Sequence, residues 1–168
     1  MAMEQKIVQC QEQAEIKKFT PYAHSWWDAE GPMKALHQIN PLRMSFILEN
    51  TSIVDRKILD VGCGGGLLTE AMAFEKAKVT GIDLNPQLIQ IAKLHLHESN
   101  LKINYHVSTA ENYAKKHHDQ FDIITCMELL EHVVSPEDVI SAISKMLKVG
   151  GIAFFSTLNR NLKSWLFG

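Results

Sequence analysis

The sequence predicts an α/β domain, in which a doubly wound, mostly parallel sheet of about five strands carries helices on both faces. Two observations lead to this prediction. From residue 57 onward, short apolar runs rich in β-branched residues alternate with longer segments of helical periodicity. The first of these runs ends in a glycine-rich turn, GCGGG at 62–66. Such alternation places successive strands in parallel, and open sheets of this kind bind ligands at a strand-to-helix turn.

Composition limits the class of protein before any motif is considered. The chain has 168 residues, of which 46% are hydrophobic, so it can form one domain with a genuine core. Its formal net charge of −2 offers no global basic field, and we expect no nucleic-acid partner. Cys10, Cys63 and Cys126 form no CxxC pair, and residues 1–10 lack the apolar segment of a signal peptide. These features indicate reduced thiols and a cytoplasmic protein.

The first fifty residues are predicted to form a helical extension that precedes the ligand-binding domain at 51–168. Residues 4–18 are polar and helical in pattern. A second helix is expected over 40–50, with Asn40 as its cap and Pro41 in its first turn, where proline has a suitable φ.

The alternating region supplies the sheet and the remaining helices, a Rossmann-like arrangement. Asn85 and Ser135 each precede a proline, so each is expected to cap a helix. Gly150 and Gly151 are expected to end the last helix before the fifth strand. The predicted strands are 57–61, 78–83, 103–107, 121–127 and 152–158, and the predicted helices are 66–76, 86–99 and 136–148.

The glycine-rich turn and two acidic residues indicate the ligand. Gly62 and Gly64 permit close backbone approach, and Asp83 ends the second predicted strand at a spacing that suits a carboxylate on the ribose hydroxyls of an adenosine. Leu67 stands where a dinucleotide-binding G-x-G-x-x-G motif needs its last glycine. Asp60 lies just before the turn. If it were desolvated beside a pyrophosphate, the repulsion would cost on the order of several kcal/mol, the size of the interaction between two charges near a protein surface. A ligand with cationic ammonium and sulfonium groups fits instead, and S-adenosylmethionine is such a ligand.

Longer stretches of the chain are similar to one family. RKILDVGCGGGLLTEAMA with VTGIDL resembles class I methyltransferases in general. Three further stretches, SWWDAEGPMKALHQINPLR (25–43), FDIITCMELLEHV (121–133) and FFSTLNRNLKSWL (154–166), resemble the ubiquinone-biosynthesis O-methyltransferases. The resemblance implies S-adenosylmethionine-dependent methylation of polyprenylated acceptors, namely 3-demethylubiquinol and a 2-polyprenyl-6-hydroxyphenol. It also implies that family members continue beyond this segment, so we expect a domain that is incomplete at its C-terminus and lacks its last strands.

Four positions match the family's contacts with the methyl donor. The resemblance assigns Gly62 to the loop, Asp83 to the ribose, and Met127 and Arg43 to the rest of the ligand. Met127 could cover a face of the ligand or pack in the core, and Arg43 could pair with the ligand's carboxylate or lie solvated on a helix. Asp60 and Gly64 complete the predicted donor site.

The segment MELLEH at 127–132 has three interpretations. If a helical turn follows the fourth strand, Glu128, Glu131 and His132 share one face and could hold Mg²⁺ or Mn²⁺, which would bind both catechol oxygens. Alternatively, His132 is a metal-free general base. In the third interpretation the segment is an acidic rim with a structural role. The family resemblance favours the metal site or the general base over the structural role.

Other residues allow both a structural and a functional interpretation. Trp26, Trp27 and Trp165 could form an apolar lid or wall, or pack in the core. Arg160 and Lys163 lie among apolar and aromatic residues near the end of the chain. This mixture suits either peripheral contact with an anionic inner membrane or a helix that packs against the C-terminal part that family members have. Other proteins of the ubiquinone pathway are further expected partners.

Two other function classes remain open at the level of sequence. The chain could be a class I methyltransferase that acts on another small acceptor. It could also bind S-adenosylmethionine without catalysing a reaction. A nicotinamide oxidoreductase is opposed by Asp60 and Leu67.

Overall fold

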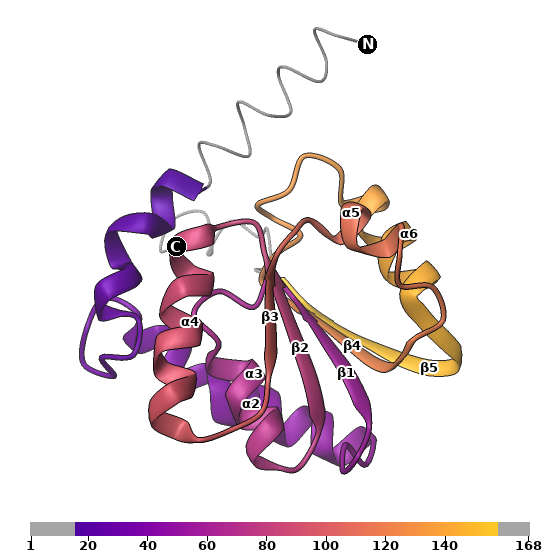
Figure 1. Ribbon diagram of the computed structural model, residues 1–168, viewed down its shortest axis with the longest axis horizontal. Helices are drawn as coiled ribbons and strands as arrows, with labels where there is room; N and C mark the ends of the chain where they lie inside the picture. The colour runs from indigo at the N-terminus through magenta and orange to yellow at the C-terminus, as the bar shows by residue number, and fades with distance from the viewer. Residues whose placement is uncertain (1–15, 158–168) are drawn as a thin grey trace, which may run out of the picture.

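Five parallel strands form the centre of the molecule in the computed structural model, which describes residues 16–157 (Figure 1). Their order across the sheet is β3-β2-β1-β4-β5, so the direction of winding reverses between β1 and β4. The strands are β1 Lys57–Val61, β2 Lys78–Asp83, β3 Asn104–Val107, β4 Phe121–Met127 and β5 Leu147–Ser156. The helices are η1 Thr20–Ser25, a 3₁₀ helix, with α2 Lys34–Asn50, α3 Leu67–Phe74, α4 Pro86–Ser99, α5 Ala110–Ala114 and α6 Pro136–Met146.

Helices cover both faces of the sheet, which confirms the predicted fold class (Figure 1). Ile58 and Leu59 are neighbours in β1 and point to opposite faces because side chains alternate along a strand. Ile58 packs in a cluster with Ile47 of α2 and Met72 of α3. Leu59 packs in a second cluster, to which α5 and α6 contribute. Burial of both faces of the sheet therefore explains why the strand sequences are almost continuously apolar.

Side-chain caps fix the start of two helices as predicted. The Asn85 side chain accepts hydrogen bonds from the backbone N–H groups of Gln87 at 3.0 Å and Leu88 at 3.4 Å. Ser135 accepts one from the backbone of Asp138 at 3.3 Å. Each cap satisfies N–H groups that the first helical turn leaves without partners.

The predicted start of the second helix at residue 40 was wrong. Helix α2 begins at Lys34, and Pro41 lies inside it. The Asn40 side chain does not cap the helix but donates to the carbonyl oxygen of Leu67 at 3.2 Å. Proline lacks the N–H for one helical hydrogen bond, and the rest of the helix continues past it. The helix predicted over 4–18 lies mostly outside the described residues, and the division at residue 50 stays a prediction.

The region from 100 to 157 holds further differences. Helix α5 was not predicted; Thr109 caps it by accepting from the backbone of Asn112 at 3.2 Å. Gly150 and Gly151 do not end α6, because α6 ends at Met146 and β5 begins directly at Leu147. Both glycines lie within β5, where the pairing with β4 shifts register between Phe121 and Ile123. They belong to an irregularity in this pairing, and glycine within a strand often marks such a place.

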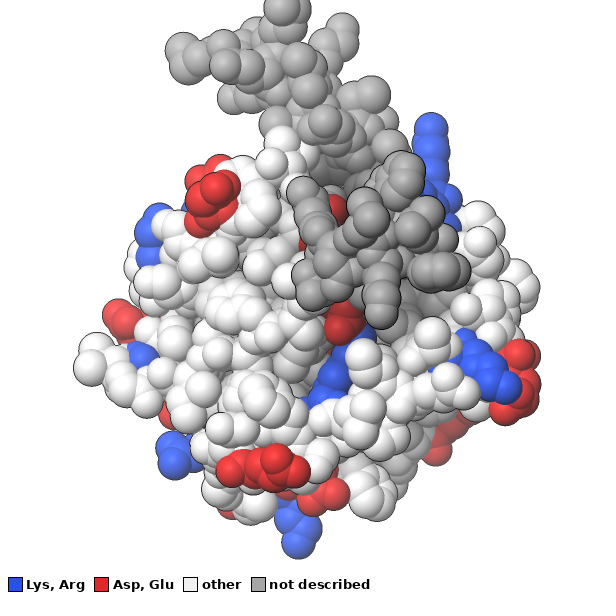
Figure 2. All heavy atoms as spheres, turned by 180° about the vertical axis from the view of Figure 1, so that it is seen from behind, with Lys and Arg blue, Asp and Glu red and all other residues white. Residues whose placement is uncertain are grey.

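The outer surface carries charges of both signs. On the face in Figure 2, basic and acidic side chains are interspersed and form no large basic area among the residues described. Within residues 16–157, none of the helices has both the length and the apolar character needed to cross a membrane.

Asp122 of β4 provides a pH-dependent test of the contacts that join β4 to its neighbours β1 and β5. One carboxylate oxygen accepts from Lys148 Nζ at 2.7 Å and the other from the backbone N–H of Lys57 at 2.8 Å. The hydrogen bond from Lys148 is the main cause that lowers the pKa of Asp122. Because the folded-state pKa is lowered, this stabilisation is present above the unfolded pKa of about 3.9 and is lost as the pH falls through the folded value.

We expect Asp122→Asn to lower the free energy of unfolding by about 1 kcal/mol at pH 7, and by progressively less below about pH 4. Urea unfolding between pH 3 and pH 7 measures the difference. Asp55→Asn is the matched control, since Asp55 pairs with Lys78 but its side chain is 78% exposed; it should change stability little at any pH. A penalty for Asp122→Asn that is equal across the range contradicts the assignment.

Candidate active site

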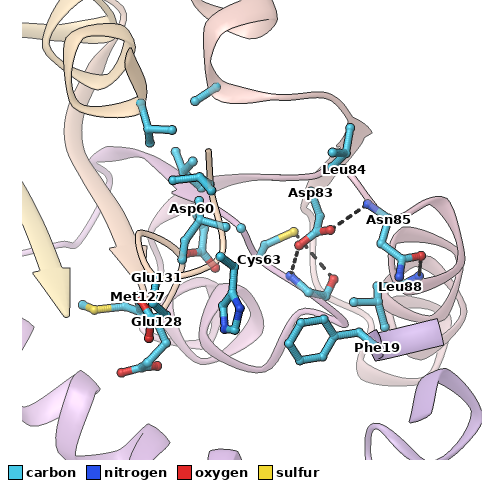
Figure 3. Close-up of a pocket in the computed structure, with 18 of the residues that line it drawn as sticks. Phe19, Asp60, Cys63, Asp83, Leu84, Asn85, Leu88, Met127, Glu128 and Glu131 are labelled. Carbon is cyan, nitrogen blue, oxygen red and sulfur yellow. Dashed lines mark hydrogen bonds between the residues drawn. The ribbon is translucent and has the colours of Figure 1, made fainter. Parts of the chain in front are cut away.

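A cavity of about 550 Å³ opens at the carboxyl ends of the strands (Figure 3). Parallel strands bring their carboxyl ends to one edge of a sheet, and this is where open α/β folds bind ligands. Every residue predicted for the site lines this one cavity: Arg43, Asp60, Gly62, Gly64, Asp83, Met127, Glu128, Glu131 and His132.

The loop between β1 and α3 requires glycine at two of the predicted positions. Gly62 has φ +75° and Gly64 has φ +54°, conformations that other residues rarely adopt. A Cβ atom at Gly64 would lie 2.6 Å from Cζ2 of Trp26, which is closer than atoms can approach. Gly62 and Gly64 therefore form part of the cavity wall, where the ring of Trp26 packs directly on the backbone of Gly64.

Asp83 ends β2 beside this loop and is held by backbone groups (Figure 3). Its carboxylate oxygens accept from the N–H of Gly64 at 2.9 Å and from the N–H of Asn85 at 2.8 Å. Burial is the largest influence on its pKa and raises it. Each oxygen keeps a further lone pair, so Asp83 can accept hydrogen bonds from a ligand such as a ribose.

Asp60 lies deeper than the sequence suggested. It is only 3% exposed, and its two oxygens accept from the hydroxyls of Thr69 at 2.6 Å and Thr125 at 2.7 Å. Burial raises the pKa of Asp60, while the two hydroxyls and the charge of Arg43 act against that rise. A fixed carboxylate thus lies behind the loop, with both oxygens already engaged by protein hydroxyls.

Arg43 and Glu128 form an ion pair across the cavity. Arg43 comes from α2, whereas Glu128 follows β4 and also accepts from the hydroxyl of Ser156 at 2.6 Å. Burial lowers the pKa of Arg43. Met127 packs at the margin of the core cluster that contains Met72, so it lines the cavity and contributes to the core at once.

The predicted helical turn at 128–132 is absent. Glu128 has φ +48° and the segment forms a non-helical turn, in which the N–H of His132 donates to the carbonyl of Leu129 at 2.9 Å. Glu131 accepts from the hydroxyl of Thr157 at 3.0 Å, and His132 meets the ring of Phe19 edge-on at 5.5 Å between centroids. The three side chains therefore share the cavity but not one helical face.

This arrangement does not form the predicted metal site. Across residues 16–157, no group of three or more His, Cys, Asp or Glu side chains is placed to hold a metal ion. Glu128 is engaged by Arg43 and Ser156, which use the carboxylate that a metal would need. The role of His132 as a general base stays a prediction.

Two cysteines near the site are not activated as nucleophiles. Burial raises the pKa of Cys63, and it raises the pKa of Cys126 to about 12. Nearby carboxylates, including Asp60, raise both further. Both thiols are therefore protonated at neutral pH and serve as small buried residues.

Sequence reasoning did not select the threonines that hold Asp60 or the aromatic side chains that close the cavity. Thr125 lies directly beside Asp60 in the parallel register of β1 and β4, and this register is not visible from sequence. Phe19 and Trp26 line the cavity from the N-terminal segment. For Trp26 the sequence offered two interpretations, lid or core, and no local signal to choose between them.

The chain is similar in sequence to known proteins. A ubiquinone biosynthesis O-methyltransferase of Vibrio atlanticus (strain LGP32) is 54% identical over 155 residues, which is 92% of this chain and 65% of that relative. This chain therefore spans slightly less than two thirds of the length of that relative.

Solved structures show the same fold. A putative S-adenosylmethionine-dependent methyltransferase from Methanococcus maripaludis matches with a TM-score of 0.72 at 19% identity, over 82% of this chain and 63% of that one. Magnesium protoporphyrin IX methyltransferase from Synechocystis PCC 6803, solved with bound S-adenosylmethionine, matches with a TM-score of 0.67 at 16% identity, over 82% of this chain and 72% of that one. The family model described as a methyltransferase domain matches residues 17–166. With the fold and this match over nearly its whole length, the chain belongs to the methyltransferase domain family.

Proposed function

We propose that this chain binds S-adenosylmethionine in the cavity and transfers its methyl group to a phenolic oxygen of a polyprenylated catechol or phenol, as in ubiquinone biosynthesis. The observation that carries the proposal is that one cavity joins Asp83, the glycine loop and His132. The name of the Vibrio atlanticus relative supports the pathway. The two specific acceptors, 3-demethylubiquinol and a 2-polyprenyl-6-hydroxyphenol, follow from the family resemblance.

The donor end of the cavity fits an adenosine that carries an amino acid. Asp83 would accept hydrogen bonds from the ribose hydroxyls, because its oxygens are oriented by two backbone N–H groups. The loop at Gly62 and Gly64 allows close approach of the ligand. Arg43 is the cation on the cavity wall that would pair with the ligand's carboxylate. When bound, the donor supplies an electrophilic methyl group on sulfur.

The acceptor end is the part of the cavity around His132. Leu129, Val133 and Phe19 line the same cavity and would pack against an aromatic ring. His132 would take the phenolic proton as the oxygen attacks, since imidazole can serve as a general base near neutral pH. The protein would also align the phenolic oxygen with the methyl group of the donor, which can lower the activation barrier by several kcal/mol.

We expect Asp83→Ala to weaken binding of S-adenosylhomocysteine. Loss of a hydrogen bond to a charged group costs about 1.5–3 kcal/mol, so affinity should fall at least about tenfold. Calorimetric titration of the 168-residue chain measures the affinity, and thermal melting shows that the variant folds.

Glu98→Ala is the matched control, because Glu98 is an exposed residue of α4 outside the cavity. It should bind S-adenosylhomocysteine as the parent chain does. Unchanged affinity in a folded Asp83→Ala variant would exclude the ribose contact.

We expect methyl transfer to survive thorough chelation of divalent cations and to depend on His132. His132→Gln should lower the rate constant by about 10²- to 10⁴-fold, the usual contribution of a general base, and leave affinity for S-adenosylhomocysteine unchanged. The measurement is methyl transfer to a short-chain catechol acceptor, with and without chelator.

Activity that disappears on chelation, returns with Mg²⁺ or Mn²⁺ and is not rescued in Glu128→Ala/Glu131→Ala would support a metal site instead. If the chain binds S-adenosylhomocysteine but transfers no methyl to any phenol, it is a binding module or methylates another class of acceptor. Turnover on other small acceptors separates those two outcomes.

We also propose peripheral contact with anionic membranes through Arg160 and Lys163, which lie outside the described residues. Each cation near such a surface contributes on the order of 1 kcal/mol. We expect weak, salt-sensitive co-sedimentation with anionic vesicles, reduced in Arg160→Ala/Lys163→Ala. Equal binding to neutral vesicles would contradict the electrostatic contact. Contact with other proteins of the pathway stays a prediction.

A further inference from the structure

The indole of Trp26 lies along the glycine loop and lines the cavity. Only 6% of the residue is exposed. A Cβ atom built at Gly65 would lie 2.3 Å from Cδ1 and 2.6 Å from Nε1 of this ring, and one built at Gly64 would lie 2.6 Å from Cζ2. The edge of the ring that carries the N–H group therefore faces the loop that we assign to the methyl donor.

This N–H group has no hydrogen-bond partner among the described residues, although it is buried. The neighbouring Trp27 provides a direct contrast, since its Nε1–H donates to the carbonyl oxygen of Gly65 at 3.0 Å. An indole nitrogen is a donor only, and a buried donor without an acceptor costs about 1–3 kcal/mol. An unsatisfied group of this kind in a ligand cavity is explained if the ligand brings the acceptor.

The surrounding contacts hold Trp26 in this position. Its carbonyl oxygen lies 2.9 Å from Nε2 of His37 in α2. Its neighbour Trp27 stacks on the imidazole of His95, with ring centroids 3.4 Å apart and planes inclined by 3°. His95 Nδ1 in turn lies 3.0 Å from a carboxylate oxygen of the buried Glu70 in α3. Contacts from α2, α3 and α4 thus hold the segment against the loop.

We propose that Trp26 is a ligand-binding residue of the donor site, and that its Nε1–H donates to a carboxylate oxygen in the amino-acid part of the methyl donor. This proposal rests on the proposed function. The carboxylate is the strongest acceptor in that ligand, because hydrogen bonds to charged oxygens are about twice as strong as neutral ones. Several acidic residues line the cavity, Asp60 and Asp83 among them, and they repel a carboxylate, so its binding needs donors such as Trp26 and Arg43.

Two ligands that differ in this group test the proposal. S-adenosylhomocysteine has the amino-acid part, whereas 5′-methylthioadenosine retains the nucleoside and thioether but lacks the carboxylate. Calorimetry on the 168-residue chain should show that Trp26→Phe, which keeps an aromatic ring but removes the N–H, weakens S-adenosylhomocysteine about 10- to 100-fold. It should change the affinity for 5′-methylthioadenosine by less than about twofold.

Trp27→Phe is the matched control. Its N–H is already bonded to Gly65, so the substitution loosens the loop and should weaken both ligands by a similar factor. If Trp26→Phe affects neither ligand, or both equally, the proposed hydrogen bond is wrong while donor binding stands. If the parent chain binds neither ligand, the proposed function itself fails, and the role of Trp26 fails with it.

Fluorescence provides a readout that does not depend on replacing Trp26. The chain has three tryptophans, so Trp27→Phe/Trp165→Phe leaves Trp26 as the sole emitter. S-adenosylhomocysteine should shift its emission, because the excited indole responds to a new charged acceptor at its N–H, and 5′-methylthioadenosine should not. Equal shifts with both ligands would contradict the carboxylate contact.

Discussion

The hydrogen bonds that hold the buried carboxylate of Asp60 fix the geometry on which the cavity depends. Burying a carboxylate costs several kcal/mol unless its oxygens are hydrogen-bonded. Thr69 and Thr125 supply these bonds from positions that are themselves fully buried. Because Asp60 is in β1, Thr69 in α3 and Thr125 in β4, one side chain joins the three elements that border the glycine loop. The hydrogen bonds of Asp60, inside a largely apolar core, therefore hold the elements on either side of the glycine loop in fixed positions.

The two acidic residues of the loop region have different roles, although the sequence suggested that both meet the ligand. Side-chain hydroxyls engage both oxygens of Asp60, so its charge acts on the cavity as a fixed field rather than through direct contact. Backbone N–H groups of Gly64 and Asn85 engage Asp83 and orient its remaining lone pairs. Burial raises the pKa of both groups, and the charge of Asp60 raises the pKa of Asp83 further. Two neighbouring carboxylates make this part of the cavity suited to hydroxyl and cationic groups.

The sequence predicted β1, β2, β4 and α4 with the bounds that the structure has, because strong periodicity and the Asn85 cap define them locally. The start of α2 and the path of β5 could not be predicted in this way. Pro41 is a local signal for a helix start that packing overrides, and Gly150 lies where the pairing of β5 with β4 shifts register, which depends on the partner strand. All predicted site residues share one cavity because parallel topology gathers strand ends. Their individual partners depend on long-range register, which a single sequence does not show.

Arg43 and Trp26 illustrate why a cavity can rely on a neutral donor beside a cation. In this structure Arg43 is paired with Glu128, which also accepts from Ser156. A ligand carboxylate that pairs with Arg43 must replace Glu128, so the free energy gained is the difference between two ion pairs, each with its own desolvation cost. The N–H of Trp26 has no hydrogen-bond partner to lose within residues 16–157. A hydrogen bond from Trp26 to the same carboxylate would add a contact and also remove the cost of a buried N–H group without an acceptor. The Trp26 hydrogen bond would therefore discriminate more strongly than the Arg43 ion pair between ligands with and without the carboxylate.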